Sequence, residues 1–96
     1  MGGNKLKRFE ENLSFDNLLQ PEREDLVKDN FLFKGKWSKF FENNNPIVLE
    51  LGCGKGEYTY SLANKYPNQN FIGIDIKGAR IWKGAKDSIS KDLKNC

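Results

Sequence analysis

The sequence predicts an α/β fold with a parallel β-sheet, on the strength of three observations. Two short runs, 47–51 and 71–74, are almost continuously apolar rather than alternating, which predicts strands buried on both faces, as in a parallel sheet. Glycines follow the first run at alternate positions: Gly52, Gly54 and Gly56. An acid, Asp75, closes the second run. Strand, glycine loop, helix, strand and terminal acid together form the adenosine-binding half of a Rossmann-like unit.

Length and composition limit the function classes. The chain has 96 residues, room for one small domain, and its formal net charge of +3 is only weak support for a nucleic-acid partner. Its two cysteines make no disulfide framework, and the lack of His excludes a His-dependent metal site or triad. With no signal peptide or membrane-length apolar run, we expect a cytoplasmic protein without membrane or metal partners. The sequence leaves the oligomeric state open.

Residues 1–45 are predicted to form an N-terminal arm and a helical extension. The first 20 residues are polar and irregular, which favours a solvated tail over an arm on a phosphate backbone. Pro21 and the acids after it indicate a helix start. Four aromatic residues then recur at helical spacing: Phe33, Trp37, Phe40 and Phe41. This stripe favours a helical layer packed on the sheet over a base-stacking surface. Asn43–Asn45 and Pro46 form a turn.

The second half continues the α/β pattern. After the glycine loop, apolar residues at helical intervals predict a helix that Pro67 ends. A strand over 71–76 and a helix over about 79–93 follow, and Asn95 falls where a third strand would begin. We therefore expect a unit truncated after its first β-α-β-α segment.

The glycine loop is compatible with several ligand classes, and Glu57 discriminates among them. A P-loop needs Gly-Lys-Ser/Thr, whereas Gly56 is followed by Glu57. The dinucleotide fingerprint places its third glycine at position 57, and a negative charge at the helix N-terminus would repel a pyrophosphate. S-adenosylmethionine has no phosphate and is a cation. The acids Glu50, Glu57 and Asp75 therefore favour S-adenosylmethionine.

Alternatives stay open for individual residues. The glycines are compatible with a simple tight turn, although the flanking acids favour a ligand site. Asp75 is predicted to bind ribose hydroxyls and is also placed to cap the next helix. Glu50 either contacts the ligand or bonds the loop amides. Cys53 is interpreted as a small packing residue.

The segment Glu50–Glu57 resembles the first motif of class I S-adenosylmethionine-dependent methyltransferases. The Gly54-Lys55-Gly56-Glu57 ending, the strand over 71–77 and the step Gly78-Ala79-Arg80 look like the bacterial tRNA (guanine-N(7)-)-methyltransferase family. The resemblance covers about residues 47–90. It implies a Rossmann-like class I methyltransferase fold, with residues 46–96 as the N-terminal half of the S-adenosylmethionine-binding domain. The implied activity is methyl transfer from S-adenosylmethionine to N7 of a guanine in tRNA.

The resemblance carries the family's cofactor contacts over at two positions, Glu50 and Asp75, and the glycine loop with Gly52, Gly54 and Gly56 matches as backbone surface for the cofactor. No catalytic residue carries over, because the family's other functional segments would lie beyond Cys96, so we expect the 96 residues alone to be inactive. The basic residues Lys77, Arg80, Lys83 and Lys86 recur every third position, and tRNA contact and a solvated helix face are equally compatible with them. A non-catalytic truncated module that binds a nucleotide or a partner is the alternative function. A dinucleotide-dependent oxidoreductase is disfavoured by Glu57.

Overall fold

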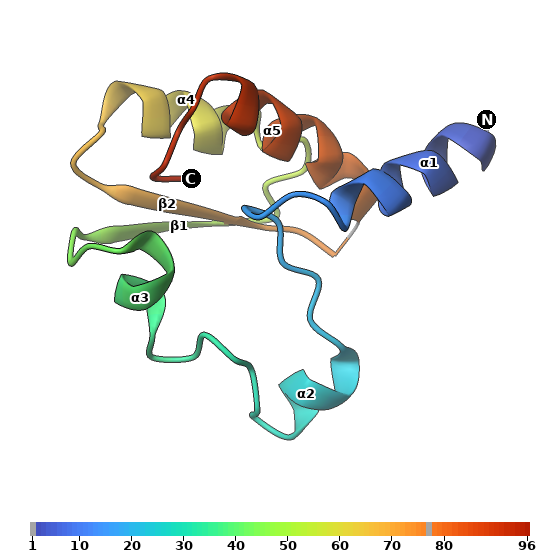
Figure 1. Cartoon of the computed structure of the whole chain (residues 1–96), viewed down its shortest axis with the longest axis horizontal. Helices are drawn as coiled ribbons and strands as arrows, with labels where there is room; N and C mark the ends of the chain where they lie inside the picture. The colour runs from blue at the N-terminus through green and yellow to red at the C-terminus, as the bar shows by residue number, and fades with distance from the viewer. Residues whose placement is uncertain (1, 77) are drawn as a thin grey trace.

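The computed structural model describes residues 2–76 and 78–96, which form helices around a small central sheet. In chain order the elements are α1 (Gly2–Asn12), α2 (Arg23–Val27), α3 (Trp37–Phe41), β1 (Ile47–Leu51), α4 (Glu57–Lys65), β2 (Asn70–Ile74) and α5 (Gly78–Ser90). Figure 1 shows α4 and α5 side by side over one face of the sheet, with α3 on the opposite side and α2 farther from the strands.

The sheet consists of two parallel strands, as the apolar runs predict. β1 and β2 pair in register from Ile47 opposite Asn70 to Leu51 opposite Ile74, and α4 is the crossover between them. A parallel pair brings the carboxyl ends of both strands to one edge. The glycine loop and Asp75, which follow those ends, therefore lie at the same edge.

The expectation that both strands are buried on both faces is wrong for β1. Along β1, half-buried residues alternate with residues that are more exposed. One row of apolar side chains, here called the open face, is exposed by 44–74%: Ile47, Leu49, Leu51 and Ile74. The physical reason is that α4 and α5 cover only one side of the sheet, and α2 stands away from the other side (Figure 1).

The core lies between the sheet, α4 and α5. Ala63 of α4, Phe71 of β2 and Ala85 of α5 are buried. At the end of α4, the side-chain Nδ2 of Asn95 donates to the carbonyl oxygens of Ala63, Tyr66 and Gln69 at 2.9, 3.1 and 2.8 Å. The carbonyls of Ala63 and Tyr66 belong to the end of α4, where no amide of the helix reaches them, and Gln69 lies in the turn before β2.

The last residues also approach the outer edge of β2. The carbonyl oxygen of Asn95 accepts a hydrogen bond from the Phe71 amide at 2.7 Å. This contact lies where the sequence predicts the beginning of a third strand.

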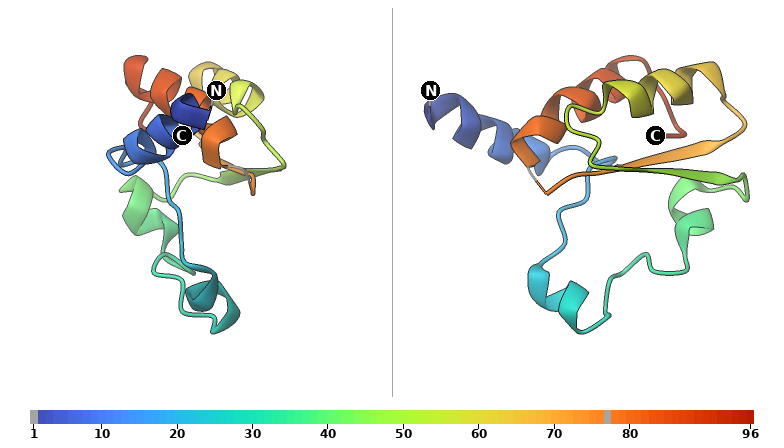
Figure 2. Two further views of the ribbon diagram at one scale, coloured as in Figure 1. Left: turned by 90° about the vertical axis from the view of Figure 1, so that its right-hand side faces the viewer. Right: turned by 180° about the vertical axis from the view of Figure 1, so that it is seen from behind.

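Residues 2–12 form a helix, where the sequence suggested an irregular tail. Helix α1 packs against α5 (Figure 2). Trp82 of α5 is the centre of the contact: its indole N–H donates to Glu11, and the Arg8 guanidinium lies 4.5 Å from the ring centroid. Lys86 of α5 lies 4.8 Å from the same centroid. A cation over an indole face gains electrostatic attraction, so polar side chains can hold this helix without an apolar stripe.

The aromatic residues before β1 pack on one another, and a helical layer packed on the sheet stays a prediction. Their ring centroids lie 5.0–6.5 Å apart: Phe31, Phe33, Trp37, Phe40 and Phe41. Only Phe41 among them is fully buried. The helix begins at Trp37 rather than Phe33, because Gly35 has a positive φ of 69° that breaks the helical path.

Candidate functional site

The glycine loop joins the carboxyl end of β1 to the first turn of α4. All three loop glycines have positive φ: 66° at Gly52, 58° at Gly54 and 74° at Gly56, a region that L-residues rarely adopt. The Cys53 amide donates to the Ile74 carbonyl at 2.9 Å and ties the loop to the end of β2. An added Cβ at Gly52 or Gly54 would meet no atom within 4 Å, so the backbone there is open to an approaching ligand.

Asp75 lies against this loop, as the sequence predicts. It follows β2 directly, is half-buried, and its Oδ2 accepts a hydrogen bond from the Gly54 amide at 2.9 Å. Helix α5 begins only at Gly78, so Asp75 is too early in the chain to occupy the position just before the helix. The acid is thus in direct contact with the loop.

Glu50 is the second predicted acid, and its observed partner is a hydroxyl. It lies in β1, and its Oε2 accepts a hydrogen bond from the hydroxyl of Thr59 at 2.5 Å. Thr59 is only 4% exposed and belongs to the first turn of α4. Glu50 therefore connects the first strand to the helix that follows the glycine loop.

The electrostatics of the loop appear at Cys53. Partial burial and, to a smaller extent, the charges of Asp75 and Glu50 together raise the pKa of the Cys53 thiol to about 11. Negative charge therefore converges on the loop from both strands. Such a site favours a cationic ligand over a phosphate group, and it keeps the thiol protonated, in agreement with the interpretation of Cys53 as a packing residue.

Three residues that support the loop were missed by sequence reasoning: Thr59, Gly73 and Gly84. A Cβ at Gly73 would lie 2.9 Å from the side chains of Cys53 and Thr59, so β2 needs a glycine there. A single glycine inside a strand is a signal of close approach and was available in the sequence. The contact of Thr59 with Glu50 has no comparable signal, because it depends on how α4 lies over β1.

Three of the four predicted tRNA-contacting residues lie in α5: Arg80, Lys83 and Lys86. Lys77 lies outside the described residues. Arg80 and Lys83 are exposed, and the Lys83 ammonium forms an ion pair with Asp87 at 3.2 Å. Lys86 lies over the Trp82 ring. Lys83 and Lys86 thus both have a partner within α5.

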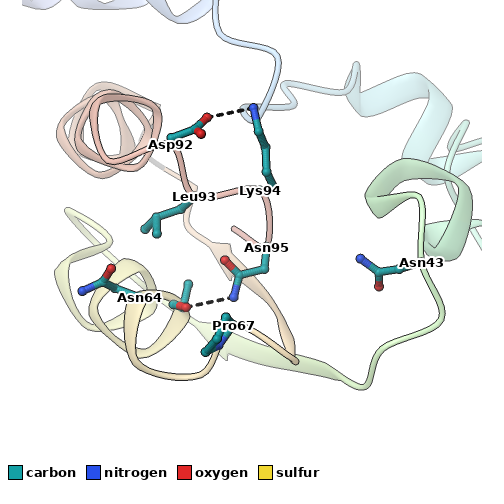
Figure 3. Close-up of a pocket in the computed structure, with 8 residues that line it drawn as sticks. Asn43, Asn64, Pro67, Asp92, Leu93, Lys94 and Asn95 are labelled. Atoms are coloured by element: carbon teal, nitrogen blue, oxygen red, sulfur yellow. Dashed lines mark hydrogen bonds and ion pairs between the residues drawn. The ribbon is translucent and has the colours of Figure 1, made fainter.

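A shallow pocket lies at the opposite edge of the sheet from the glycine loop (Figure 3). Asn43, before β1, and Pro67, before β2, both line it, which places it at the amino ends of the strands. The polar groups of Asn95 and Lys94 at its wall already bond the Ala63 carbonyl and Asp92. The candidate site is therefore the glycine loop with its two acids.

Comparison with known proteins defines the class of this chain. Residues 44–96 match the family model described as "Putative methyltransferase", and the chain belongs to this family. Its relatives include the tRNA (guanine-N(7)-)-methyltransferase of Christiangramia forsetii, 62% identical over 93 residues, which are 96% of this chain and 42% of that protein. The proteins of the same name from Cytophaga hutchinsonii and Bacteroides fragilis are 50% and 49% identical. The matches cover 99% of this chain and 41% and 38% of those two proteins.

The chain thus spans about two fifths of the length of these relatives. Among the described residues, no helix has both the length and the hydropathy that a membrane span requires.

Proposed function

We propose that this chain is the methyl-donor-binding N-terminal part of a tRNA (guanine-N(7)-)-methyltransferase that uses S-adenosylmethionine. The observation that carries the proposal is the convergence of Glu50 and Asp75 on the glycine loop, where both raise the pKa of Cys53. A sulfonium cation with an ammonium group is attracted to such a site, whereas a dinucleotide pyrophosphate is repelled. Glu57 in the first turn of α4 adds to this preference.

The proposed fold is the Rossmann-like class I methyltransferase fold. Residues 46–96 would form the N-terminal half of the donor-binding domain, and residues 1–45 an N-terminal arm and helical extension. The parallel pair β1–β2, its crossover α4 and the position of the acids at the carboxyl edge support this assignment.

The loop residues fit S-adenosylmethionine by their chemistry. The open backbone at Gly52 and Gly54 gives the ligand close access, and Asp75 offers a carboxylate for the ribose hydroxyls. Glu50 would act mainly through Thr59, by fixing α4 against β1. When bound, S-adenosylmethionine would supply an electrophilic methyl group. Guanine N7 has a lone pair and no proton at neutral pH, so the reaction needs positioning rather than a strong base.

For the tRNA, the proposed contacts are the basic residues Lys77, Arg80, Lys83 and Lys86. The exposure of Arg80 and Lys83 supports phosphate contact, since backbone phosphates are bound by accessible cations. Lys83 would exchange its ion pair with Asp87 for a phosphate. An exposed ion pair is weak enough to allow this exchange.

Calorimetry tests the proposal on the full-length enzyme, with S-adenosylhomocysteine and NAD as the two titrants. We expect S-adenosylhomocysteine to bind and NAD to give no heat of binding. Binding of NAD without S-adenosylhomocysteine would replace the proposal with a dinucleotide-dependent activity. A mass-spectrometric assay for N7-methylguanine in tRNA then tests the transfer itself.

A further inference from the structure

Helix α5 touches the glycine loop where neither element has a side chain. Gly84 of α5 and Gly56 of the loop are both buried, and they face each other. A Cβ at Gly84 would lie 2.3 Å from the carbonyl oxygen of Lys55 and 3.1 Å from the Cα of Gly56. These are backbone atoms of the loop, so no side-chain rotation can relieve the clash. Even one methyl group at position 84 would push the loop away from the helix.

The choice of glycine at position 84 is unfavourable for the helix itself. Apart from proline, glycine is the least stabilising residue in a helix interior. Position 84 lies in the middle of α5, with six residues before it and six after it in Gly78–Ser90. A packing requirement at the loop gives a physical reason for accepting this loss.

The loop is held from two sides. On the strand side, the Cys53 and Gly54 amides donate to the Ile74 carbonyl and to Asp75, each at 2.9 Å. On the helix side, the contact with Gly84 is steric. The position of the loop therefore depends on where α5 lies.

Helix α5 is in turn fastened by the N-terminal segment. The Trp82 indole, two residues before Gly84, donates to Glu11, and the cations of Arg8 and Lys86 lie 4.5 and 4.8 Å from its ring centroid. Asn17 Nδ2 donates to the carbonyl of Ala85 at 3.3 Å. Figure 2 shows α1 beside the first half of α5.

From these contacts we infer that Gly84 is a positioning residue for methyl-donor binding: it allows α5, braced by α1, to set the place of the loop 52–56. The residue touches no ligand and acts through the backbone of Lys55 and Gly56. This inference rests on the proposed function. It assigns a role in donor binding to a residue outside the glycine motif, and it gives the N-terminal segment the role of holding α5 in place.

The test is the variant Gly84→Ala in the full-length enzyme, assayed by methyl-transfer kinetics and by calorimetry with S-adenosylhomocysteine. We expect the KM for S-adenosylmethionine and the Kd of S-adenosylhomocysteine to rise at least tenfold. The kcat at saturating donor and the KM for tRNA should stay within twofold. A displaced loop weakens donor binding, whereas a general loss of folded enzyme would lower kcat instead.

Ser88→Thr is the matched control. Ser88 is buried in the same helix and also gains one methyl group, but its hydroxyl contacts Cys96 rather than the loop. Its donor KM should equal that of the unmodified enzyme. Gly84→Ala with a donor Kd within twofold of the unmodified enzyme would overturn the inference. Failure of the unmodified enzyme to bind S-adenosylhomocysteine would instead overturn the proposed function.

A second variant covers the case in which Gly84→Ala does not fold. Trp82→Phe keeps an aromatic ring but removes the N–H that Glu11 accepts, so it loosens α5 without adding an atom near the loop. We expect the donor KM to rise at least threefold with kcat unchanged. An unchanged donor KM in this variant would contradict the inference.

Discussion

At the scale of single residues, Asp75 has one observed task and one proposed task. Its Oδ2 accepts the Gly54 amide at 2.9 Å, and the proposed function gives the carboxylate the ribose hydroxyls as well. The two tasks can be separated by substitution, because an amide side chain keeps an acceptor oxygen while losing the charge.

We predict that Asp75→Asn weakens binding of S-adenosylhomocysteine about tenfold, since a hydrogen bond to a charged group contributes roughly 1.5–3 kcal/mol. Asp75→Ala should weaken binding further, because it also leaves the Gly54 amide without this partner. Titration calorimetry on the full-length enzyme measures both. Asp16→Asn, an exposed acid in the N-terminal segment, is the control and should bind normally. Equal affinity of Asp75→Asn and the parent enzyme would remove Asp75 from the site.

Cys53 provides a second test at this scale. Burial and the nearby acids raise the pKa of its thiol to about 11, so almost all of it is protonated at neutral pH. Because the thiolate is the nucleophile, we predict alkylation by iodoacetamide at pH 7.5 roughly 100-fold slower than for a free cysteine. The rate should rise with pH up to about 11.

Asp75→Asn should lower the pKa of Cys53 and speed its alkylation, because it removes one of the negative charges that raise the pKa. Peptide mass spectrometry separates Cys53 from Cys96, and Cys53→Ser supplies the background. Fast alkylation of Cys53 at pH 7.5 would show that burial and the nearby acids do not raise the pKa of this thiol, and an Asp75→Asn variant with an unchanged rate would remove the contribution of Asp75.

At the scale of elements, Asn95 fastens the end of α4 to the last residues of the chain. One amide nitrogen serves the carbonyls of Ala63, Tyr66 and Gln69 within 3.1 Å. We predict that Asn95→Asp destabilises the fold by about 3 kcal/mol, because it replaces a buried donor with an acceptor that faces carbonyl oxygens. Urea denaturation followed by circular dichroism measures the loss. Asn64→Asp, exposed on the same helix, is the control, and equal unfolding midpoints would refute the capping role.

The basic residues of α5 give a prediction about tRNA. The double variant Lys83→Glu, Lys86→Glu of the full-length enzyme should bind tRNA more weakly. The slope of the logarithm of the binding constant against the logarithm of salt concentration should become shallower by about one for each lost phosphate contact. The control reverses two other lysines, Lys28 and Lys34, which pair with Glu24 and Asp29 outside α5. Filter binding at several salt concentrations compares the two variants. Equal losses in both would indicate a general charge effect and leave α5 as a solvated face.

Elements differ in how far the sequence predicts them. The strands and their parallel pairing follow from two apolar runs, and the glycine loop from residues that need positive φ. Helix α1 could not be predicted in the same way, because its attachment depends on Trp82, about 70 residues later in the chain. The Gly84 contact is likewise invisible locally, since a helical glycine gives no indication of which backbone it faces. Local pattern therefore predicts the acids and glycines, and tertiary packing decides what holds them.

At the scale of the whole molecule, the chain spans about two fifths of the relatives' length. We predict that these 96 residues alone transfer no methyl group to tRNA, because no guanine pocket has been identified among the residues that the structure describes. Incubation with S-adenosylmethionine and unmodified tRNA, followed by mass spectrometry for N7-methylguanine, checks this. The full-length enzyme is the positive control. Detectable N7-methylguanine from the 96 residues alone would contradict the prediction.

The open face has a consequence for synthesis on the ribosome. If this chain begins the proposed enzyme, more than half of the relatives' length is made after it, which at about 5–20 residues per second takes on the order of ten seconds. During that interval Leu49, Leu51 and Ile74 stay in contact with water on the nascent polypeptide. The growing chain would then depend on holdase chaperones, and their depletion should lower the yield of native enzyme more than its rate of translation.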